Sequence, residues 1–174
     1  MHGRLALVLL AVASSAGAQT RHNTDAPINF GADRIELQDK ANRAVLAGNV
    51  SVRQAEMTLN AQRMTVAYTG QVVDGSPQVS RLDASGGVTV VRPDQTARSR
   101  YGVYDLNRRV ITMLGAVTLT QGGNTVSGGR LTINLDTGRA VIDGSSVAGS
   151  SSGGGVSQAP GGRVSGTFSV PKRN

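Results

Sequence analysis

A glycine-anchored pattern recurs four times along this chain, at a nearly constant spacing. In each copy a glycine leads into a short β-branched run; the glycines are Gly48, Gly86, Gly115 and Gly144, which lie 38, 29 and 29 residues apart. A second, eight-residue segment keeps step with them, and its copies are Phe30–Leu37, Leu59–Val66, Ala97–Tyr104 and Val126–Ile133. One unit of about 29 residues is therefore repeated, with nine extra residues inserted around Thr69–Gln78. Such periods predict stacked supersecondary units rather than the single packed core of an enzyme.

Alternation of apolar and polar residues runs through every copy of the repeat. Val50 and Val52 alternate with Ser51 and Arg53, and Val88–Val90, Val117–Leu119 and Leu131–Ile133 follow the same pattern. A period of two with β-branched residues is typical of strands that have one apolar and one polar face. Because no window shows a sustained helical period, we expect an all-β protein of roughly 14–16 short strands.

The repeated glycines interrupt runs that otherwise read as continuous strands. A glycine inside a strand usually marks a bulge or corner, because it adopts positive φ without a Cβ clash. A phase shift supports this interpretation, since Phe30 and Ala32 share one parity while Ile35 and Leu37 share the other. A sheet with regularly spaced corners is expected to fold over itself as a roll or wrapped sandwich.

The two ends of the chain differ from the repeat region. Residues 1–18 combine a positive start, an apolar run and a small-residue cleavage site, which predicts a secretory signal peptide. We expect a soluble, exported protein with a flexible N-terminus over 19–26 and a β domain over 27–147. Residues 148–174 form a basic tail rich in Gly and Ser, with a possible short strand from Gly166. Cysteine is absent, so no disulfide stabilises the fold.

The strands carry little material for a core. The whole chain has two Phe, three Tyr and no Trp, and protein interiors are usually filled to crystal-like density. Two interpretations compete: small residues allow the sheets to approach closely, or the apolar faces are splayed and an external apolar ligand completes the core.

Catalytic chemistry is hard to assemble from these residues. Beyond the leader only His22 remains as a histidine, so a catalytic triad or a zinc site lacks ligands. Asp33 and Glu36 are not repeated as carboxylates in later copies, which favours solvated strand positions over a catalytic pair. The sequence therefore predicts no enzyme, no cofactor and no metal site.

Five segments together resemble the LptA/OstA family of periplasmic lipopolysaccharide-transport proteins. They cover essentially the whole repeat region and are Pro27–Leu37 (PINFGADRIEL), Leu46–Gln54 (LAGNVSVRQ), Leu59–Val66 (LNAQRMTV), Ala97–Leu106 (ARSRYGVYDL) and Val110–Gln121 (VITMLGAVTLTQ). The resemblance implies a V-shaped β-jellyroll, open at both ends, whose apolar interior holds the acyl chains of lipid A. It implies a location in the periplasm, head-to-tail stacking of copies, and docking between a membrane-anchored LptC-like and an outer-membrane LptD-like component. No nucleic-acid partner is expected.

By the same resemblance, one set of apolar residues is expected to line a lipid-binding groove. Its members are Ile28, Phe30, Val50, Val52, Leu59, Val66, Val88, Val90, Tyr104, Val117 and Leu119. Arg34, Arg53 and Arg63 are candidates for contact with lipid A phosphates at the mouth of the groove.

Three functions remain open at this point. The first is a non-enzymatic lipopolysaccharide carrier, and the second is a self-stacking structural β-module that binds no lipid. The third is a glycan-active enzyme that uses carboxylates such as Asp83 and Asp105, which would need to face one cleft about 5–10 Å apart.

Overall fold

The computed structural model describes residues 22–70, 77–144 and 165–167, and these residues form an all-β protein, as predicted. Within these described ranges, one 3-10 turn, η1 (Asp39–Ala41), lies among the strands. The strands are β1 (Ile28–Gly31), β2 (Arg34–Gln38), β3 (Arg43–Gln54), β4 (Met57–Thr69), β5 (Gln78–Arg92), β6 (Gln95–Asp105), β7 (Val110–Gln121), β8 (Asn124–Asn134), β9 (Ala140–Asp143) and β10 (Ser165–Thr167). The predicted leader over 1–18 and most of the tail lie outside the described residues.

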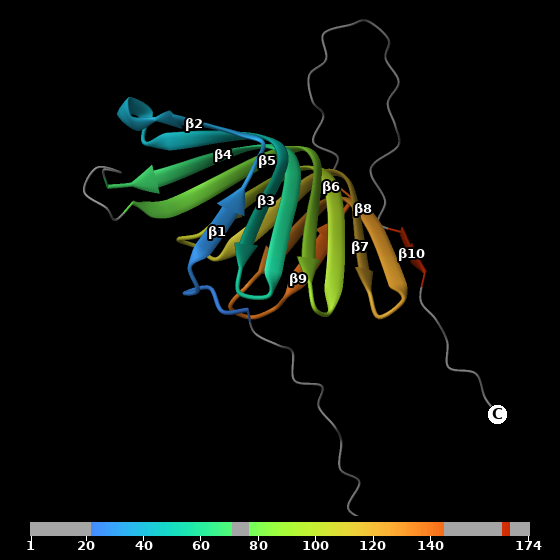
Figure 1. Ribbon diagram of the computed structural model, residues 1–174. Helices are drawn as coiled ribbons and strands as arrows, with labels where there is room; N and C mark the ends of the chain where they lie inside the picture. Colours follow the sequence, from blue (N-terminus) through green and yellow to red (C-terminus); the bar gives the residue numbers. More distant parts are fainter. Residues whose placement is uncertain (1–21, 71–76, 145–164, 168–174) are drawn as a thin grey trace, which may run out of the picture.

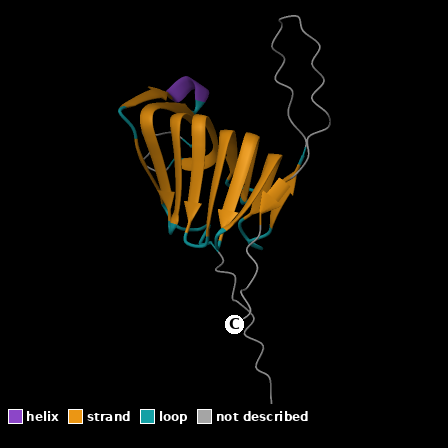
Figure 2. Cartoon of the chain, turned by 90° about the vertical axis from the view of Figure 1, so that its right-hand side faces the viewer, coloured by secondary structure: helices purple, strands orange, loops and turns teal. Residues whose placement is uncertain are grey.

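All ten strands belong to one antiparallel sheet. Strands β3 to β8 pair in sequence order, β1 and β2 both pair with β3, and β9 and β10 both pair with β8. The long strands lie side by side in one row and arch over, so that the sheet is V-shaped in cross-section (Figures 1 and 2). Consecutive hairpins explain this order, because neighbours in sequence become neighbours in the sheet.

Each long strand is divided by a register shift into two arms, and the arms form two halves of the sheet. The β2 half starts at β2 and ends at β9; its middle arms are Arg43–Ala47, Arg63–Thr69, Gln78–Ser85, Tyr101–Asp105, Val110–Leu114 and Arg130–Asn134. The β1 half starts at β1 and ends at β10; its middle arms are Val50–Gln54, Met57–Ala61, Val88–Arg92, Gln95–Ser99, Val117–Gln121 and Asn124–Gly128.

The predicted glycine bulges form the crease between the halves. Gly48, Gly86 and Gly115 have φ of 77°, 83° and 79°, and each is followed by a second residue with positive φ. A Cβ on Gly86 would lie 2.7 Å from the Cβ of Gln62, so the crease needs glycine there for space as well as for φ. The fourth glycine, Gly144, directly follows the end of β9 instead.

The strand count reflects the same crease. The sequence predicted roughly 14–16 short strands, whereas six of the ten observed strands are 11–15 residues long. The backbone pairs on both sides of each bulge, so two predicted segments become the two arms of one strand. The insertion predicted around Thr69–Gln78 coincides with the end of β4, the start of β5 and the connection between them.

Both halves contribute to one apolar cluster inside the V. Leu46, Met64 and Ile111 of the β2 half and Leu59 and Val88 of the β1 half are almost completely buried in it. Apart from two tyrosines the cluster consists of aliphatic residues and methionines, as the composition predicted. Among the described residues, the structure contains no helix that is long and apolar enough to span a membrane.

Candidate functional site

The eleven residues predicted to line a groove all lie on the inner face of the V. Residues that are directly opposite in an antiparallel pair share a face of the sheet. Phe30 pairs with Val52, Val52 with Leu59, and the row continues through Val90 and Leu119. Nine of the eleven are buried; the other two, Ile28 and Phe30, belong to edge strand β1. Contact of these eleven residues with lipid stays a prediction.

An uncovered apolar rim lies at the β1/β2 edge of the sheet. Phe30, Ile35 and Leu37 are 49%, 46% and 58% exposed, although their register places them on the inner face. Ile35 lies opposite Leu46, which is fully buried, so the row loses its cover only at the edge strand. We call Phe30, Ile35 and Leu37 the apolar rim. Its side chains continue the core to the end of the sheet, where no other described strand covers them.

A short N-terminal segment, residues 22–27, crosses part of the open side of the V, and we call it the strap. It is held by Gln54, whose side chain is 2% exposed. The Gln54 Nε2 donates to the carbonyl oxygens of Thr24 (2.8 Å) and Ala26 (3.1 Å), and His22 Nε2 lies 3.2 Å from Gln54 Oε1. The sequence placed His22 in a flexible N-terminus; instead its ring is partly buried against the end of β3.

Gln54 also joins the two halves of the sheet. The hydroxyl of Tyr104, on the β2 half, donates to Gln54 Oε1 at 2.7 Å. Burial raises the pKa of Tyr104 to about 12, which keeps the hydroxyl protonated as a donor. Burial lowers the pKa of His22, so the ring is held neutral, and nearby Arg92 acts in the same direction. The strap contact is therefore a network of neutral groups.

A second contact ties the strap to the tips of the β2 half. Arg109, in the β6–β7 turn, forms ion pairs with Asp25 (3.0 Å) and Asp136 (3.3 Å). A cavity of about 740 Å³ lies between strap and strands, lined by residues that include Ile28, Val79 and Leu106. The strap thus spans from one half to the other above this cavity.

Four polar residues lie on the inner face that the sequence did not predict there. Gln54, Arg92, Gln95 and Ser99 are buried, with exposed fractions of 2–8%. The signal for them was present, because Gln54 and Arg92 each follow an inner-face valine by two residues. Extending the alternation to the end of each arm would have placed them inside. Each lies in the β1 half, which therefore has the more polar inner face.

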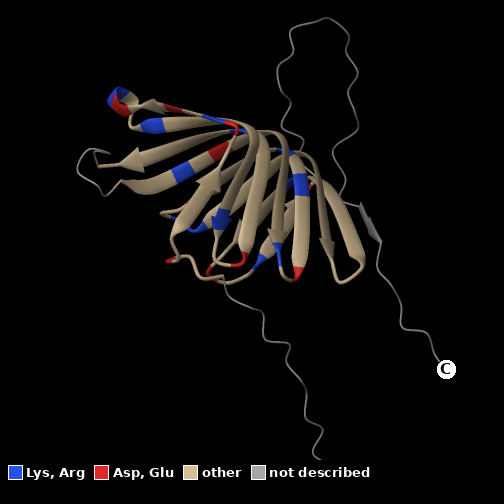
Figure 3. Cartoon of the chain, viewed as in Figure 1, with Lys and Arg blue, Asp and Glu red and all other residues tan. Residues whose placement is uncertain are grey.

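The three arginines proposed for phosphate contact do not face the interior. Arg53 alternates with buried Val52 and Gln54, and Arg63 directly precedes buried Met64. Arg34 precedes Ile35, whose register partner is the buried Leu46. All three are exposed on the outer face because of this alternation. In Figure 3 the Lys and Arg residues are distributed over several strands and turns.

The carboxylates considered for catalysis accept hydrogen bonds from nearby groups. Both oxygens of Asp83 accept bonds from exposed Arg81, at 2.8–3.0 Å, and Asp105 accepts from the backbone N–H of Arg108. Asp33 accepts from the side chain of Asn49 (2.9 Å) at the crease, and Glu36 from Gln38 (2.8 Å). Across the described ranges, no three His, Cys, Asp or Glu side chains gather in a way that could hold a metal ion.

The creased antiparallel sheet and the apolar cluster that it encloses are those of an open β-jellyroll. Residues 30–139 match the family described as LptA/(LptD N-terminal domain) LPS transport protein, and the chain belongs to this family of lipopolysaccharide-transport proteins. An uncharacterised protein of Rhizobium meliloti (strain 1021) is 33% identical over 144 residues, which are 80% of this chain and 77% of that protein.

A solved structure shares the fold. It is that of LptH from Pseudomonas aeruginosa, described as the LptA-homologous periplasmic component of the conserved lipopolysaccharide transport device. The two structures superpose with a TM-score of 0.68, covering 85% of this chain and 99% of LptH, at 19% sequence identity. The predicted β-jellyroll is thereby confirmed.

Proposed function

We propose that this chain is a non-enzymatic carrier that moves lipopolysaccharide through the periplasm, with the acyl chains of lipid A inside the V. Family membership supports the transport role. The observation that carries the proposal is the inner face, where one apolar cluster spans both halves and ends in the exposed apolar rim. A face of this kind suits a ligand that must be hidden from water along its length.

The energetic reason for such a carrier is the exposure of acyl chains. Each CH₂ group exposed to water costs about 0.8 kcal/mol, so one twelve-carbon chain would face a barrier of roughly 10 kcal/mol. An apolar interior that continues to the end of the sheet removes most of this barrier. The crease supplies a route to open the interior, since in the part of the chain that the structure describes the halves are connected through bulges rather than through a third layer.

The same proposal includes assembly with similar domains. At the β1/β2 edge, the outer sides of both strands have no partner among the described strands, and unpaired edges favour strand addition. Stacked copies, together with LptC-like and LptD-like components at the two membranes, would extend one apolar path across the periplasm. The apolar rim would then be covered by the neighbouring domain.

Photocrosslinking in cells tests the carrier function. A benzophenone residue at Val50, which is 2% exposed on the inner face, should give an adduct with lipopolysaccharide. Ser51, the next residue and on the outer face, is the matched control and should give none. Phe30 and Asn29 form a second such pair on β1, where the half-exposed Phe30 tolerates a larger side chain.

The outcomes separate this function from its alternative. Adducts at Val50 and Phe30 without adducts at their neighbours would support the carrier. The closely packed cluster of the present structure favours the alternative, a self-stacking structural module without lipid. Absence of adducts at both inner positions, in protein that is folded and exported, would establish that alternative.

A charge at the apolar rim provides a second test. Phe30→Asp should reduce lipid binding strongly while the strands still form, because the side chain is 49% exposed and contributes little to the core. Circular dichroism and a lipid-binding assay measure the two effects separately. Parallel loss of fold and binding would show that Phe30 is ordinary core.

A further inference from the structure

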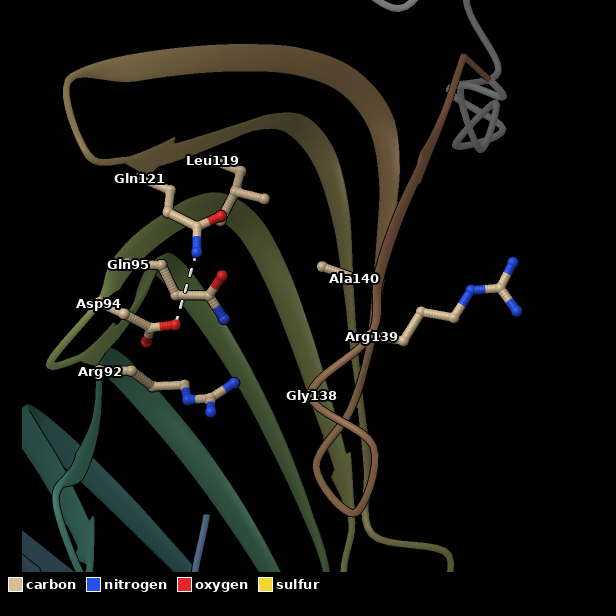
Figure 4. Close-up of a pocket in the computed structure, with 8 residues that line it drawn as sticks. All are labelled: Arg92, Asp94, Gln95, Leu119, Gln121, Gly138, Arg139 and Ala140. Atoms are coloured by element: carbon tan, nitrogen blue, oxygen red, sulfur yellow. Dashed lines mark hydrogen bonds between the residues drawn. The ribbon is translucent and has the colours of Figure 1, made fainter. Parts of the chain in front are cut away.

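Two smaller cavities lie on different faces of the sheet. One, of about 380 Å³, lies between the two halves, where the ends of β5, β6 and β7 face the turn that leads into β9 (Figure 4). Its wall carries Arg92, which interacts with another group of the protein, and Gln95, whose buried Nε2 has no hydrogen-bond partner among the described residues. This cavity belongs to the interior of the V. The other, of about 280 Å³, lies on the outer face, and we call it the outer cavity.

The outer cavity lies across three neighbouring strands of the β2 half. Arg63 of β4 pairs with Ser85 of β5, and Ser85 pairs with Tyr101 of β6, so a long side chain stands on either side of a small one. All three alternate with buried residues and therefore face outward. With strands about 4.8 Å apart, Arg63 and Tyr101 rise from backbones about 10 Å apart. One ring fits between them, since each van der Waals contact takes about 3.5–4 Å.

Tyr101 presents an aromatic surface to this cavity. It is 56% exposed, whereas Tyr68 and Tyr104 are buried. The hydroxyl of buried Ser99 donates to the carbonyl oxygen of Tyr101 at 2.7 Å, which fixes the backbone from which the ring projects. One exposed aromatic residue is ordinary on a protein surface. Its position in a cavity that also holds polar groups without partners is what points to a ligand.

These polar groups carry an excess of positive charge. Both oxygens of Asp83 are bonded to Arg81, which neutralises the carboxylate and draws it away from Ser85. Arg63 is exposed and forms no ion pair with any residue of the described ranges. The hydroxyls of Thr65 and Ser85 also have no hydrogen-bond partner in that part of the chain. The outer cavity therefore offers one cation and two hydroxyls beside an aromatic face.

We propose that the outer cavity binds the ring of an acidic saccharide of the hexuronate type. The C–H groups on one face of a pyranose ring form an apolar surface that suits contact with the ring of Tyr101. The carboxylate of the sugar complements the guanidinium of Arg63, which binds carboxylates in a bidentate way. Hydroxyls around the sugar ring suit Thr65 and Ser85, whose hydroxyls both donate and accept hydrogen bonds. The site lies on the opposite face from the apolar cluster and does not depend on the proposed carrier function.

An NMR titration of the isotope-labelled protein with methyl α-D-galactopyranosiduronic acid tests the site. A ligand of this size should bind with a Kd on the order of 1 mM and shift the backbone amides of residues 83–85 and 101–103. The matched neutral sugar, methyl α-D-galactopyranoside, should bind about fivefold more weakly, because it lacks the carboxylate. Absence of shifts at these amides up to about 50 mM of the acid would overturn the proposal.

Three substitutions separate the contacts. Tyr101→Ala should weaken binding of both sugars about fivefold, because it removes the stacking surface. Arg63→Gln should weaken binding of the acid about fivefold and leave that of the neutral sugar within about twofold. Arg98→Gln removes an exposed arginine from the outer face of β6, outside the cavity, and should leave both affinities within about twofold. All three side chains are exposed, so the variants are expected to fold, and their NMR spectra show whether they do.

Each result decides for or against the site. Equal affinity for the acid and the neutral sugar would overturn it, as would equal effects of Arg63→Gln and Arg98→Gln on binding of the acid. Digalacturonic acid identifies the source of the saccharide. Tighter binding than that of the methyl glycoside would support a site for a polysaccharide chain, and an affinity no higher would support a site for a single sugar residue.

This test is independent of the photocrosslinking experiment, because Val50 and Tyr101 lie on opposite faces of the sheet. A lipopolysaccharide adduct at Val50 without sugar binding would support the carrier function and remove the outer site. Sugar binding that depends on Tyr101 and Arg63, without an adduct at Val50, would support the outer site and remove the carrier function.

Discussion

Two glutamines on the inner face of the β1 half show how differently the two parts of the open side are built. Gln54 ends the inner row of β3 and Gln95 begins that of β6, and both are buried, at 2% and 7% exposure. Gln54 bonds to two strap carbonyls, to His22 and to the Tyr104 hydroxyl. Gln95 has a buried Nε2 without a partner.

The available partners, rather than the residue type, therefore decide whether a buried amide on this face stabilises the fold. At Gln54 the chain supplies every acceptor and donor from the strap and from the β2 half, so the amide closes the structure on itself. At Gln95 the opposite half supplies Gly138 and Ala140, which offer no side-chain acceptor. One part of the open side is therefore closed by bonds to a buried amide, whereas the other keeps a buried amide donor without an acceptor.

The largest effect that tests this comparison is expected for Gln54→Leu. The substitution leaves the Tyr104 hydroxyl and two carbonyls of the strap without their partner, which should lower the free energy of unfolding by about 2–4 kcal/mol. Urea denaturation followed by circular dichroism measures it. A loss below about 1 kcal/mol would mean that water replaces these bonds readily and that Gln54 is no structural tie.

A pH titration tests the same network through the ionisation of the Tyr104 hydroxyl. Its pKa of about 12 lies above the ordinary value of 10, so the folded protein keeps a proton that the unfolded chain releases. This stabilisation is complete below pH 10 and disappears as the pH rises through about 12. The loss should be on the order of 2 kcal/mol, measured by urea denaturation at each pH.

Tyr104→Phe is the control for that titration. The variant lacks the hydroxyl, so its stability should fall less steeply between pH 10 and 12 than that of the wild type. Other groups that titrate in this range contribute equally to both proteins. Identical slopes would show that the Tyr104 hydroxyl has the same pKa in the folded and unfolded states.

Gln95→Leu should have a small effect of opposite sign. The substitution removes a donor without a partner and adds apolar surface beside Ala97 and Leu119, so stability should stay equal or rise by up to about 1 kcal/mol. Urea denaturation of the ligand-free protein measures it, with Gln54→Leu as the matched comparison. A loss similar to that of Gln54→Leu would show that the two amides serve the same structural purpose.

How much of this could be predicted depends on how far apart the interacting residues lie. The bulges at Gly48, Gly86 and Gly115 and the inner rows of valines are local patterns, so the all-β roll and its apolar face follow from the sequence. The network at Gln54 joins residues 28–50 positions away, and alternation alone does not show which groups meet there. The cavity at Gln95 likewise needs the β8–β9 turn to face the β5–β6 hairpin, which depends on how far the crease bends.

The smallest effect is expected for Asp25→Asn, which removes the ion pair between the strap and Arg109. The Asp25 side chain is 83% exposed, and exposed ion pairs contribute about 0–1 kcal/mol and are screened by salt. Arg109 also keeps its contact to Asp136. We expect a loss below about 0.5 kcal/mol in urea denaturation, and 0.5 M NaCl should reduce it further because it screens the ion pair. A loss approaching that of Gln54→Leu would mean that the strap is held by charge, and the buried amide would then no longer explain why this part of the open side is closed.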